Sequence, residues 1–324
     1  MNASSVITKD YENNNAFRLN GNKAKQTQSN PISKPAPLRP LRLNLVPFRS
    51  QKSSKLVVKS CKKLTLLILG LGFCLSGCAV NPITGQKHLN FFTPQQEVEI
   101  GRKYAPQIEE QMGGKIENVT LQNYLDNVGQ KIARVSHTRQ WEYHFYALED
   151  KSVNAFALPG GYVFITRGML EKLNSEAQLA SILAHETVHV VARHSSRAMT
   201  KQIGYQMVLS TITSEETSKT VLNVADLTWQ IVGLKYSRAD EQEADVTGLD
   251  YLVSAGYNPY AMVETMQMLQ SQQKTRPIEF LSTHPVPENR IEYLTRKIQT
   301  TYNLSELKTG TDDYQKAVLD QLAN

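Results

Sequence analysis

Residues 174–194 read NSEAQLASILAHETVHVVARH. Ser175 and Gln178 have the spacing of a helix-capping pair, so we expect a helix to begin just after Ser175. Apolar residues that recur every three or four positions then predict that this helix packs against a core. These residues are Leu179, Ile182, Leu183 and Val190. The sequence therefore predicts a buried helix that continues to His194.

Two histidines of this helix, His185 and His189, are four residues apart. That spacing places them on one helix face, about 5.4 Å apart along the axis, where they can share a metal ion. Glu186 is rotated by about 100° and can reach a metal-bound water without binding the metal. A His-Glu-x-x-His motif on a helix is typical of a metalloprotease whose glutamate is the general base. Two ordinary histidines are the alternative interpretation, and the capped apolar helix argues against it.

The cysteines restrict the choice of metal ligands. Cys61, Cys74 and Cys78 are the three cysteines of the chain, so a metal site in its body must use histidine and carboxylate. A catalytic zinc usually has three protein ligands and one open position. The candidates for the third ligand are His194, Glu241, Glu243 and His284. His194 lies about 180° from His185 on a continuous helix, which predicts a surface or supporting residue rather than a co-ligand.

A second predicted helix supplies the carboxylate candidates. Residues 237–245 read SRADEQEAD, in which Glu241 and Asp245 share a helix face and Glu243 points away from it. A carboxylate one turn after a ligand can accept the ring N–H of a ligating histidine and hold its orientation. A solvated charged face is the alternative interpretation of this segment.

The remaining pattern predicts an α+β domain, mostly helical, with a small sheet before the His-Glu-x-x-His helix. Alternating apolar residues predict short strands at 143–147, 153–157 and 162–166. Caps and helical spacings predict further helices at 93–112, 121–132, 221–234 and 237–255, and after Pro259 and Pro287. Residues 210–220 predict a polar loop.

The N-terminal part of the sequence predicts a targeting segment rather than a folded domain. Residues 1–58 are polar and basic without an apolar period, which predicts disorder. Residues 59–77 combine lysines with an apolar run shorter than the ~20 residues of a membrane-spanning helix, which predicts a signal peptide. Residues 78–92 are then a tether, and residues 93–324 form the metallopeptidase domain.

The end of this signal, LSGC at 75–78, resembles the lipobox of bacterial lipoproteins. The resemblance implies cleavage before Cys78 and its lipidation, which would hold the domain at a membrane. Ala79, in place of the aspartate that retains such lipoproteins at the inner membrane, implies an outer-membrane location facing the periplasm. A short anchor or buried helix is the alternative interpretation. The segment ahead of the signal indicates either a start site at Val57 or Val58, which we favour, or a mitochondrial transit peptide.

The distribution of charge excludes nucleic acid as a partner. The net charge of the chain is +6, which by itself suggests an anionic partner. Residues 1–78, however, hold 13 basic residues and only two acids, Asp10 and Glu12. Residues 79–324 hold 23 basic and 28 acidic residues, a net charge of −5. The basic character therefore belongs to the N-terminal segment.

Three ordered motifs resemble the HtpX/Oma-type zinc metallopeptidases, which are metallopeptidase family 48 among the gluzincins. They are His185–His189, the Ser-Arg-x-x-Glu-x-x-Ala-Asp pattern at 237–245, and NAFALPGG at 154–161. The resemblance covers roughly residues 80–300, and the lipobox makes the bacterial lipoprotein members the most similar.

This resemblance implies a zincin-like fold and a role for each motif residue. One zinc ion per chain would be bound by His185, His189 and Glu241. Glu186 would be the general base, and Asp245 would support a ligand from behind.

Further elements carry implied roles around the metal. Pro159-Gly160-Gly161 would lead into the edge strand that pairs with an extended substrate. His284, within Thr283-His284-Pro285, would stabilise the oxyanion, or bind zinc as a fourth ligand and keep the enzyme latent. Arg238 is a second candidate for a supporting residue and oxyanion donor.

The expected function is hydrolysis of internal peptide bonds in misfolded or stalled cell-envelope proteins, as part of periplasmic quality control. Two alternatives stay open. One is a non-enzymatic, chaperone-like assembly factor that binds a metal, because some members of the family act in that way. The other is a quality-control protease of the mitochondrial inner membrane.

Overall fold

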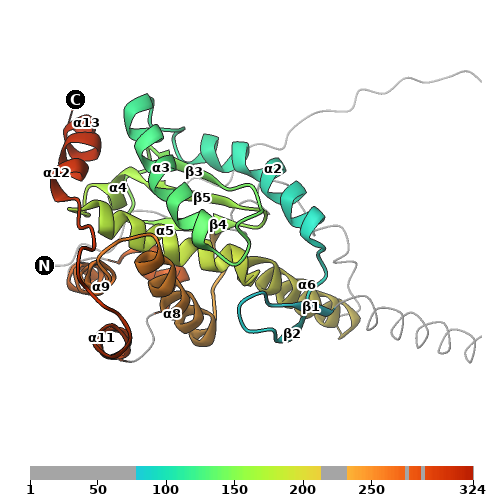
Figure 1. The fold of residues 1–324 in the computed structure, drawn as a ribbon. Helices are drawn as coiled ribbons and strands as arrows, with labels where there is room; N and C mark the ends of the chain where they lie inside the picture. The colour runs from blue at the N-terminus through green and yellow to red at the C-terminus, as the bar shows by residue number, and fades with distance from the viewer. Residues whose placement is uncertain (1–77, 213–231, 274–276, 286–288, 324) are drawn as a thin grey trace, which may run out of the picture. The chain divides into compact units, whose positions relative to one another are not determined.

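The predicted buried helix is the centre of the fold. It is α5, Glu176–Val191, in the computed structural model, which describes residues 78–212, 232–273, 277–285 and 289–323 (Figure 1). All 16 residues of α5 are buried. A helix buried on every side must have packing partners on every side.

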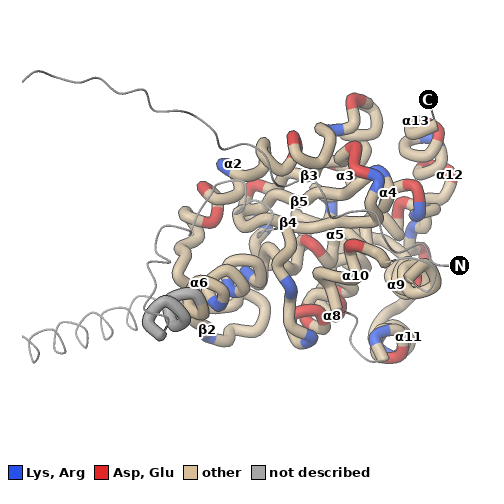
Figure 2. Tube along the Cα trace, turned by 180° about the vertical axis from the view of Figure 1, so that it is seen from behind, with Lys and Arg blue, Asp and Glu red and all other residues tan. Residues whose placement is uncertain are grey.

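The neighbours of α5 form two layers (Figures 1 and 2). A small sheet and α3, Val119–Val135, pack on one side of it. Helices α8, Arg238–Ser254, and α9, Tyr260–Gln273, pack on the other side. Gly248 allows α8 to approach closely, because a Cβ atom there would lie only 3.3 Å from the backbone nitrogen of His185. The close approach of α5 and α8 brings the two predicted motif helices together.

The sheet has three strands in the order β3-β5-β4. They are β3, His144–Leu148; β4, Ala155–Leu158; and β5, Tyr162–Thr166. β5 is parallel to β3, with Phe145 opposite Val163, and antiparallel to β4. The strand that follows Pro159-Gly160-Gly161 is therefore the central strand, and the expectation that it is an edge strand is wrong. The edge strand next to that turn is β4, which precedes it.

Both faces of this sheet are covered. Alternate residues such as Phe145 and Val163 join the main core around α5, which also receives the predicted apolar stripe of α3. The other face, with Phe156 and Phe164, forms a second core with α2, Pro94–Gln111. Helix α2 begins with the predicted capping box of Thr93 and Gln96.

The other helices complete the domain. They are α4 (Arg167–Leu170), α6 (His194–Ile212), α10 (Glu279–Thr283), α11 (Arg290–Thr301), α12 (Thr311–Tyr314), the π-helix η2 (Gln315–Leu319) and α13 (Asp320–Leu322). The prediction of a mostly helical α+β domain with a small sheet before the His-Glu-x-x-His helix is confirmed.

Two details differ from the expected elements. The helix predicted to run to His194 ends at Val191, and α6 begins at His194 after a break. The predicted polar loop at 210–220 begins within α6, which reaches Ile212, and its remainder lies outside the described residues. Most of the helix expected at 221–234 also lies outside them.

Residues 78–92, predicted as a tether, contain a hairpin of β1, Cys78–Val80, and β2, Lys87–Leu89. Asn81 in its loop and Asn90 after it are buried. The predicted segments 1–58 and 59–77 lie outside the described residues.

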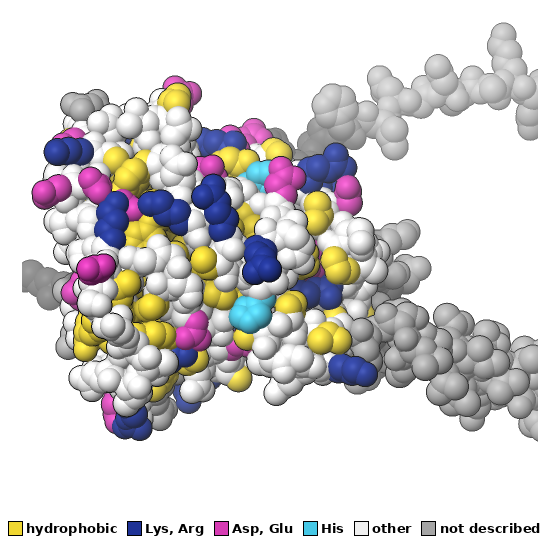
Figure 3. Space-filling view, viewed as in Figure 1, with side chains coloured by type: hydrophobic (Ala, Val, Ile, Leu, Met, Phe, Trp, Pro, Cys, Tyr) yellow, Lys and Arg dark blue, Asp and Glu magenta, His cyan; other side chains and the backbone are white. Residues whose placement is uncertain are grey.

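The surface of the described part is mixed in character. Basic, acidic and apolar side chains are interspersed on the face seen in Figure 3. Within the ranges that the structure describes, no helix is both long enough and apolar enough to cross a membrane.

Candidate metal centre

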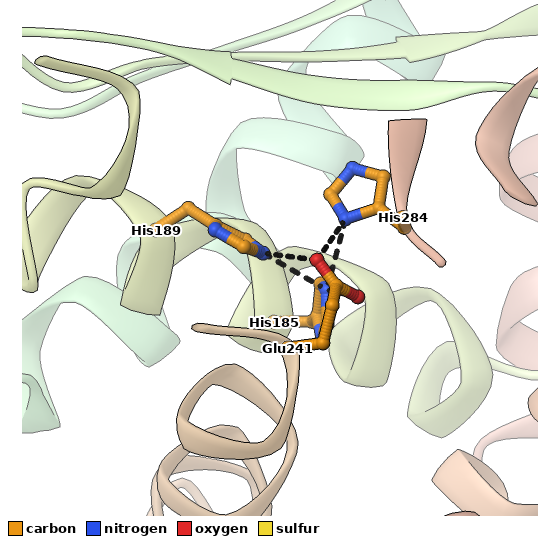
Figure 4. A group of neighbouring side chains, drawn as sticks. All are labelled: His185, His189, Glu241 and His284. Atoms are coloured by element: carbon orange, nitrogen blue, oxygen red, sulfur yellow. Dashed lines mark hydrogen bonds and ion pairs between the residues drawn. The ribbon is translucent and has the colours of Figure 1, made fainter. Parts of the chain in front are cut away.

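Four side chains from three segments converge at the middle of α5 (Figure 4). His185 and His189 extend from α5, Glu241 from the first turn of α8, and His284 follows α10. All four are fully buried, with no exposed fraction. The structure thus brings together both helix histidines and two of the four candidates for a further ligand.

Four separations between donor atoms are close to those of a tetrahedral metal site, and all of the donor atoms lie within 4.8 Å of one another. The Nε2 atoms of His185 and His189 are 3.1 Å apart, and the latter is 3.5 Å from Oε1 of Glu241. Nδ1 of His284 is 3.0 Å from the same oxygen and 3.3 Å from Nε2 of His185. Ligands at 2.0–2.2 Å from a tetrahedral zinc would be about 3.3–3.6 Å from one another. The donor set therefore has the size and the composition of a metal site.

The charge around His185 also favours a cation. Burial lowers the pKa of His185, but the carboxylates of Asp245 and Glu241 outweigh this and raise it above its ordinary value. Burial and the charge of His185 hold the pKa of His189 well below its ordinary value. One positive charge is thus favoured within the group, and a metal ion can supply it in place of a proton.

Asp245 contacts the ring of His185 on the side away from the donor group. Its Oδ1 is 3.1 Å from Nδ1 of His185, so the ring N–H donates to the carboxylate and Nε2 keeps its lone pair for the centre. Arg290 and Tyr293 also donate hydrogen bonds to Asp245. Burial would raise the pKa of Asp245, but the charge of Arg290 and the hydrogen bond from His185 lower it. The carboxylate is therefore ionised and fixed in place.

Glu186 has a different environment from the other buried carboxylates. It is fully buried, and neither of its oxygens has a hydrogen-bond partner among the described residues. The nearest histidine nitrogen is Nε2 of His284, 3.6 Å away. Burial raises the pKa of Glu186 to about 8, against the opposing charges of His284 and Arg290. A buried carboxylate without a partner is costly and marks a candidate for proton transfer.

Comparison with known proteins agrees with this geometry. Residues 120–298, from α3 to α11, match Peptidase family M48. The chain belongs to this family. The prediction made from the three motifs is confirmed, and membership implies a catalytic metal, which the four converging residues could hold.

Named relatives of this M48 family member come from bacteria and from mitochondria. The putative beta-barrel assembly-enhancing protease of Vibrio cholerae is 31% identical over 245 residues, which cover 70% of this chain and 50% of that protein. The beta-barrel assembly-enhancing protease of Escherichia coli is 31% identical over 208 residues, or 60% of this chain and 42% of that protein. The mitochondrial metalloendopeptidase OMA1 of Schizosaccharomyces pombe is 33% identical over 197 residues, or 59% and 56%. The chain spans about half the length of these relatives.

Within this M48 domain, His194 occupies an unexpected place. It was predicted to be a surface or supporting residue about 180° from His185 on a continuous helix, but α5 stops at Val191 and Arg193 adopts a left-handed conformation with φ 59°. This turn brings Nδ1 of His194 to 2.9 Å from Nδ1 of His189. The ion pair of Arg193 with Glu97, at 2.7 Å, holds the turn. Sequence reasoning could not find this contact, because a non-glycine residue with positive φ has no clear sequence signal.

A second arginine, which the sequence pattern did not single out, lies beside the cluster. Arg238 is exposed at the start of α8. Arg290 is buried at the start of α11, contacts Asp245, and has Nη1 3.7 Å from Oε2 of Glu241. Its sequence signal was weak, because a basic residue after a proline-rich segment usually lies in solvent.

The Pro159-Gly160-Gly161 turn is buried rather than open. Gly160 and Gly161 have φ 86° and 96°, and a Cβ on Gly161 would lie 2.3 Å from the carbonyl oxygen of Glu142. A Cβ on Gly160 would lie 2.5 Å from Cα of Val98 in α2. These contacts explain why the turn carries two glycines.

Proposed function

We propose that this M48 family member is a zinc-dependent endopeptidase. The observation that carries the proposal is the convergence of four donor atoms beside the buried carboxylate of Glu186, which has no hydrogen-bond partner among the residues described. Histidine nitrogens with one carboxylate oxygen are typical ligands of catalytic zinc.

One zinc ion per chain would be held by His185, His189 and Glu241, with His284 at the fourth position. When bound, zinc supplies Lewis acidity and lowers the pKa of water to near ~7. Glu186 would accept the proton of the attacking water and return it to the leaving nitrogen of the cleaved peptide bond. Asp245 would hold His185 in the correct tautomer through this cycle.

His284 has two possible roles in this proposal, and its geometry favours one. Its Nδ1 lies inside the donor group, 3.0 Å from Glu241, as a fourth ligand would. With the fourth position filled, the enzyme would be latent until His284 moves. In the second role, its N–H would donate to the oxyanion after that movement. His284→Ala should raise basal proteolysis if the first role dominates and lower it if the second does.

We propose edge strand β4, rather than the Pro159-Gly160-Gly161 turn itself, as the strand that pairs with an extended substrate. β4 pairs with β5 on one side, and it packs against α5. Main-chain pairing at a sheet edge would accept many sequences, which suits a protease that acts on unfolded chains.

The proposed substrates are misfolded or stalled envelope proteins, and the proposed place is the bacterial cell envelope. The names of the Vibrio cholerae and Escherichia coli relatives support this. The lipobox supports attachment through a lipidated Cys78, at the outer membrane facing the periplasm. Intact mass of the mature protein tests the location: a diacylated Cys78 is expected, and an unmodified N-terminus before residue 60 would instead support the mitochondrial alternative.

The decisive test of activity separates the enzyme from a metal-binding assembly factor. Zinc-loaded wild-type protein should cleave casein, and Glu186→Gln should bind zinc equally but lose activity by about 10²–10⁴-fold, the usual contribution of a general base. Retained cleavage in Glu186→Gln would refute this mechanism, and a wild-type protein that binds zinc without cleaving unfolded chains would favour the assembly factor.

A further inference from the structure

The second metal-site histidine has a support of its own, built from three hydrogen bonds in series. Nδ1 of His189 is 2.9 Å from Nδ1 of His194. Nε2 of His194 is 3.2 Å from Oε2 of Glu243. The other oxygen of Glu243 accepts a hydrogen bond of 2.7 Å from the side-chain amide of Asn81. The series connects the centre of the domain with the β1–β2 loop.

The chemistry of these groups allows one proton arrangement that leaves His189 ready to bind a metal. A carboxylate can only accept, so both Asn81 and Nε2 of His194 donate to Glu243. With its proton on Nε2, the ring of His194 has a lone pair on Nδ1, which accepts the N–H of His189 Nδ1. The proton of His189 is thereby placed on Nδ1, and its Nε2 presents a lone pair to the donor group. The reverse tautomer of His194 would place a proton on the wrong nitrogen of His189.

We propose that His194 and Glu243 are positioning residues for His189, and that Asn81 anchors them to the hairpin that begins at Cys78. The proposal rests on the metal site described above. It gives a role to Glu243, although Glu243 points away from the face of α8 that Glu241 and Asp245 share.

The groups of this series are closely packed. His194 is fully buried, and Glu243 has only 17% of its side chain exposed. Tyr236 stacks on the His189 ring with centroids 4.0 Å apart, which limits rotation of the ring. The carbonyl oxygen of the Asn81 side chain accepts the backbone N–H of Ile83 at 2.8 Å, which orients its amide toward Glu243.

The two helix histidines are thus supported differently. The Nδ1 atom of His185 donates directly to Asp245, whereas the Nδ1 atom of His189 is connected to the carboxylate of Glu243 through His194. Because His194 lies between His189 and Glu243, the hairpin loop, about 100 residues earlier in the chain, can influence the orientation of the His189 ring.

The test is the zinc affinity of the purified protein, measured by competition with a chromogenic chelator, with the absorption of bound Co²⁺ as the second readout. His194→Leu removes the acceptor for His189, whereas the shorter His194→Asn offers an oxygen near the position of Nδ1. We expect His194→Leu to weaken zinc binding roughly 10- to 100-fold and to change the Co²⁺ spectrum, and His194→Asn to restore most of the affinity.

Glu243→Gln tests the series without replacing a histidine. It should weaken zinc binding by roughly 10-fold. Its matched control is Asp250→Asn, the same chemical change on α8 at a carboxylate that instead binds Lys297 and Tyr302. This control should bind zinc as the wild type does. Asn81→Ala should have a smaller effect in the same direction.

The outcomes separate this inference from the proposed function. Wild-type affinity and an unchanged Co²⁺ spectrum in both His194→Leu and Glu243→Gln would overturn the positioning role while leaving the zinc site intact. A wild-type protein that binds no zinc would overturn both. If His194→Leu fails to fold by circular dichroism, Glu243→Gln against Asp250→Asn decides the question.

Discussion

Helix α5 carries two buried glutamates, and their surroundings are opposite. Glu176, in the first turn, accepts hydrogen bonds from four side chains. They are Tyr124 at 2.8 Å, Tyr257 at 2.6 Å, Lys131 at 3.1 Å and Lys308 at 2.7 Å. Glu186, ten residues later, has no hydrogen-bond partner within the described ranges.

This difference separates a structural carboxylate from a reactive one. Burial would raise the pKa of Glu176, but its lysine and tyrosine donors lower it to about 2. Burial raises the pKa of Glu186 to about 8. A buried carboxylate that accepts several hydrogen bonds holds elements of the fold together. A buried carboxylate without a hydrogen bond is a candidate for proton transfer. The first glutamate ties α5 to α3 and to the C-terminal segment, and the second faces the proposed zinc site.

Removal of the proposed zinc ion should have the largest effect, on both proteolysis and thermal stability. We expect a chelator to abolish proteolysis and to lower Tm, because the converging donors lose the ion that binds them together. Free zinc at 1,000 times its Kd would stabilise the folded state by about 4 kcal/mol. Thermal unfolding with and without zinc measures this. Glu241→Ala should lose most of the zinc-dependent shift, and an undiminished shift in that variant would exclude Glu241 as a ligand.

Glu176→Gln should have the next largest effect, and it acts on stability. The substitution removes two ion pairs from a carboxylate that is only 2% exposed. The lowered pKa corresponds to about 2 kcal/mol, allowing for the half-exposed lysines. Urea unfolding at pH 7 measures it, with Glu99→Gln at an exposed pair as the control, for which no change is expected. Equal midpoints for Glu176→Gln and wild type would contradict the comparison.

The difference in unfolding free energy between wild type and Glu176→Gln should depend on pH with a definite sign. The pKa of Glu176 is lower in the folded state, about 2, than its ordinary value of 4.5. Its contribution to stability is therefore complete above pH 4.5 and is lost as the pH falls toward 2. The difference in unfolding free energy between wild type and Glu176→Gln should shrink over that range. A difference that stays constant from pH 5 to pH 2 would show that the ion pairs contribute little.

Glu186→Gln should change stability with the opposite sign. In the metal-free protein the pKa of Glu186 is raised from 4.5 to about 8, so the folded state loses stability as the pH rises between these values. The variant does not titrate, so at pH 8 we expect it to be at least as stable as wild type. Urea unfolding of both metal-free proteins checks this. A clear loss of stability of the variant at pH 8 would mean that donors stabilise the charged form of Glu186 in the folded protein.

The sequence by itself determined the fold class, the α5 helix and the placing of His185, Glu186 and His189 on it. It also predicted that Glu241 and Asp245 share one face of α8. These features depend on caps and on the 3.6-residue period, which act over a few residues and can be read from the chain.

Tertiary structure alone decided the rest. The left-handed turn at Arg193 is held by Glu97, 96 residues earlier, and it brings His194 against His189, whereas a continuous helix would place it about 180° from His185. The central position of β5 and the burial of Arg290 beside Asp245 likewise arise from contacts between distant segments. The physical reason is that local periodicity sets which way a side chain points within its own helix, whereas only packing between elements sets what it meets there.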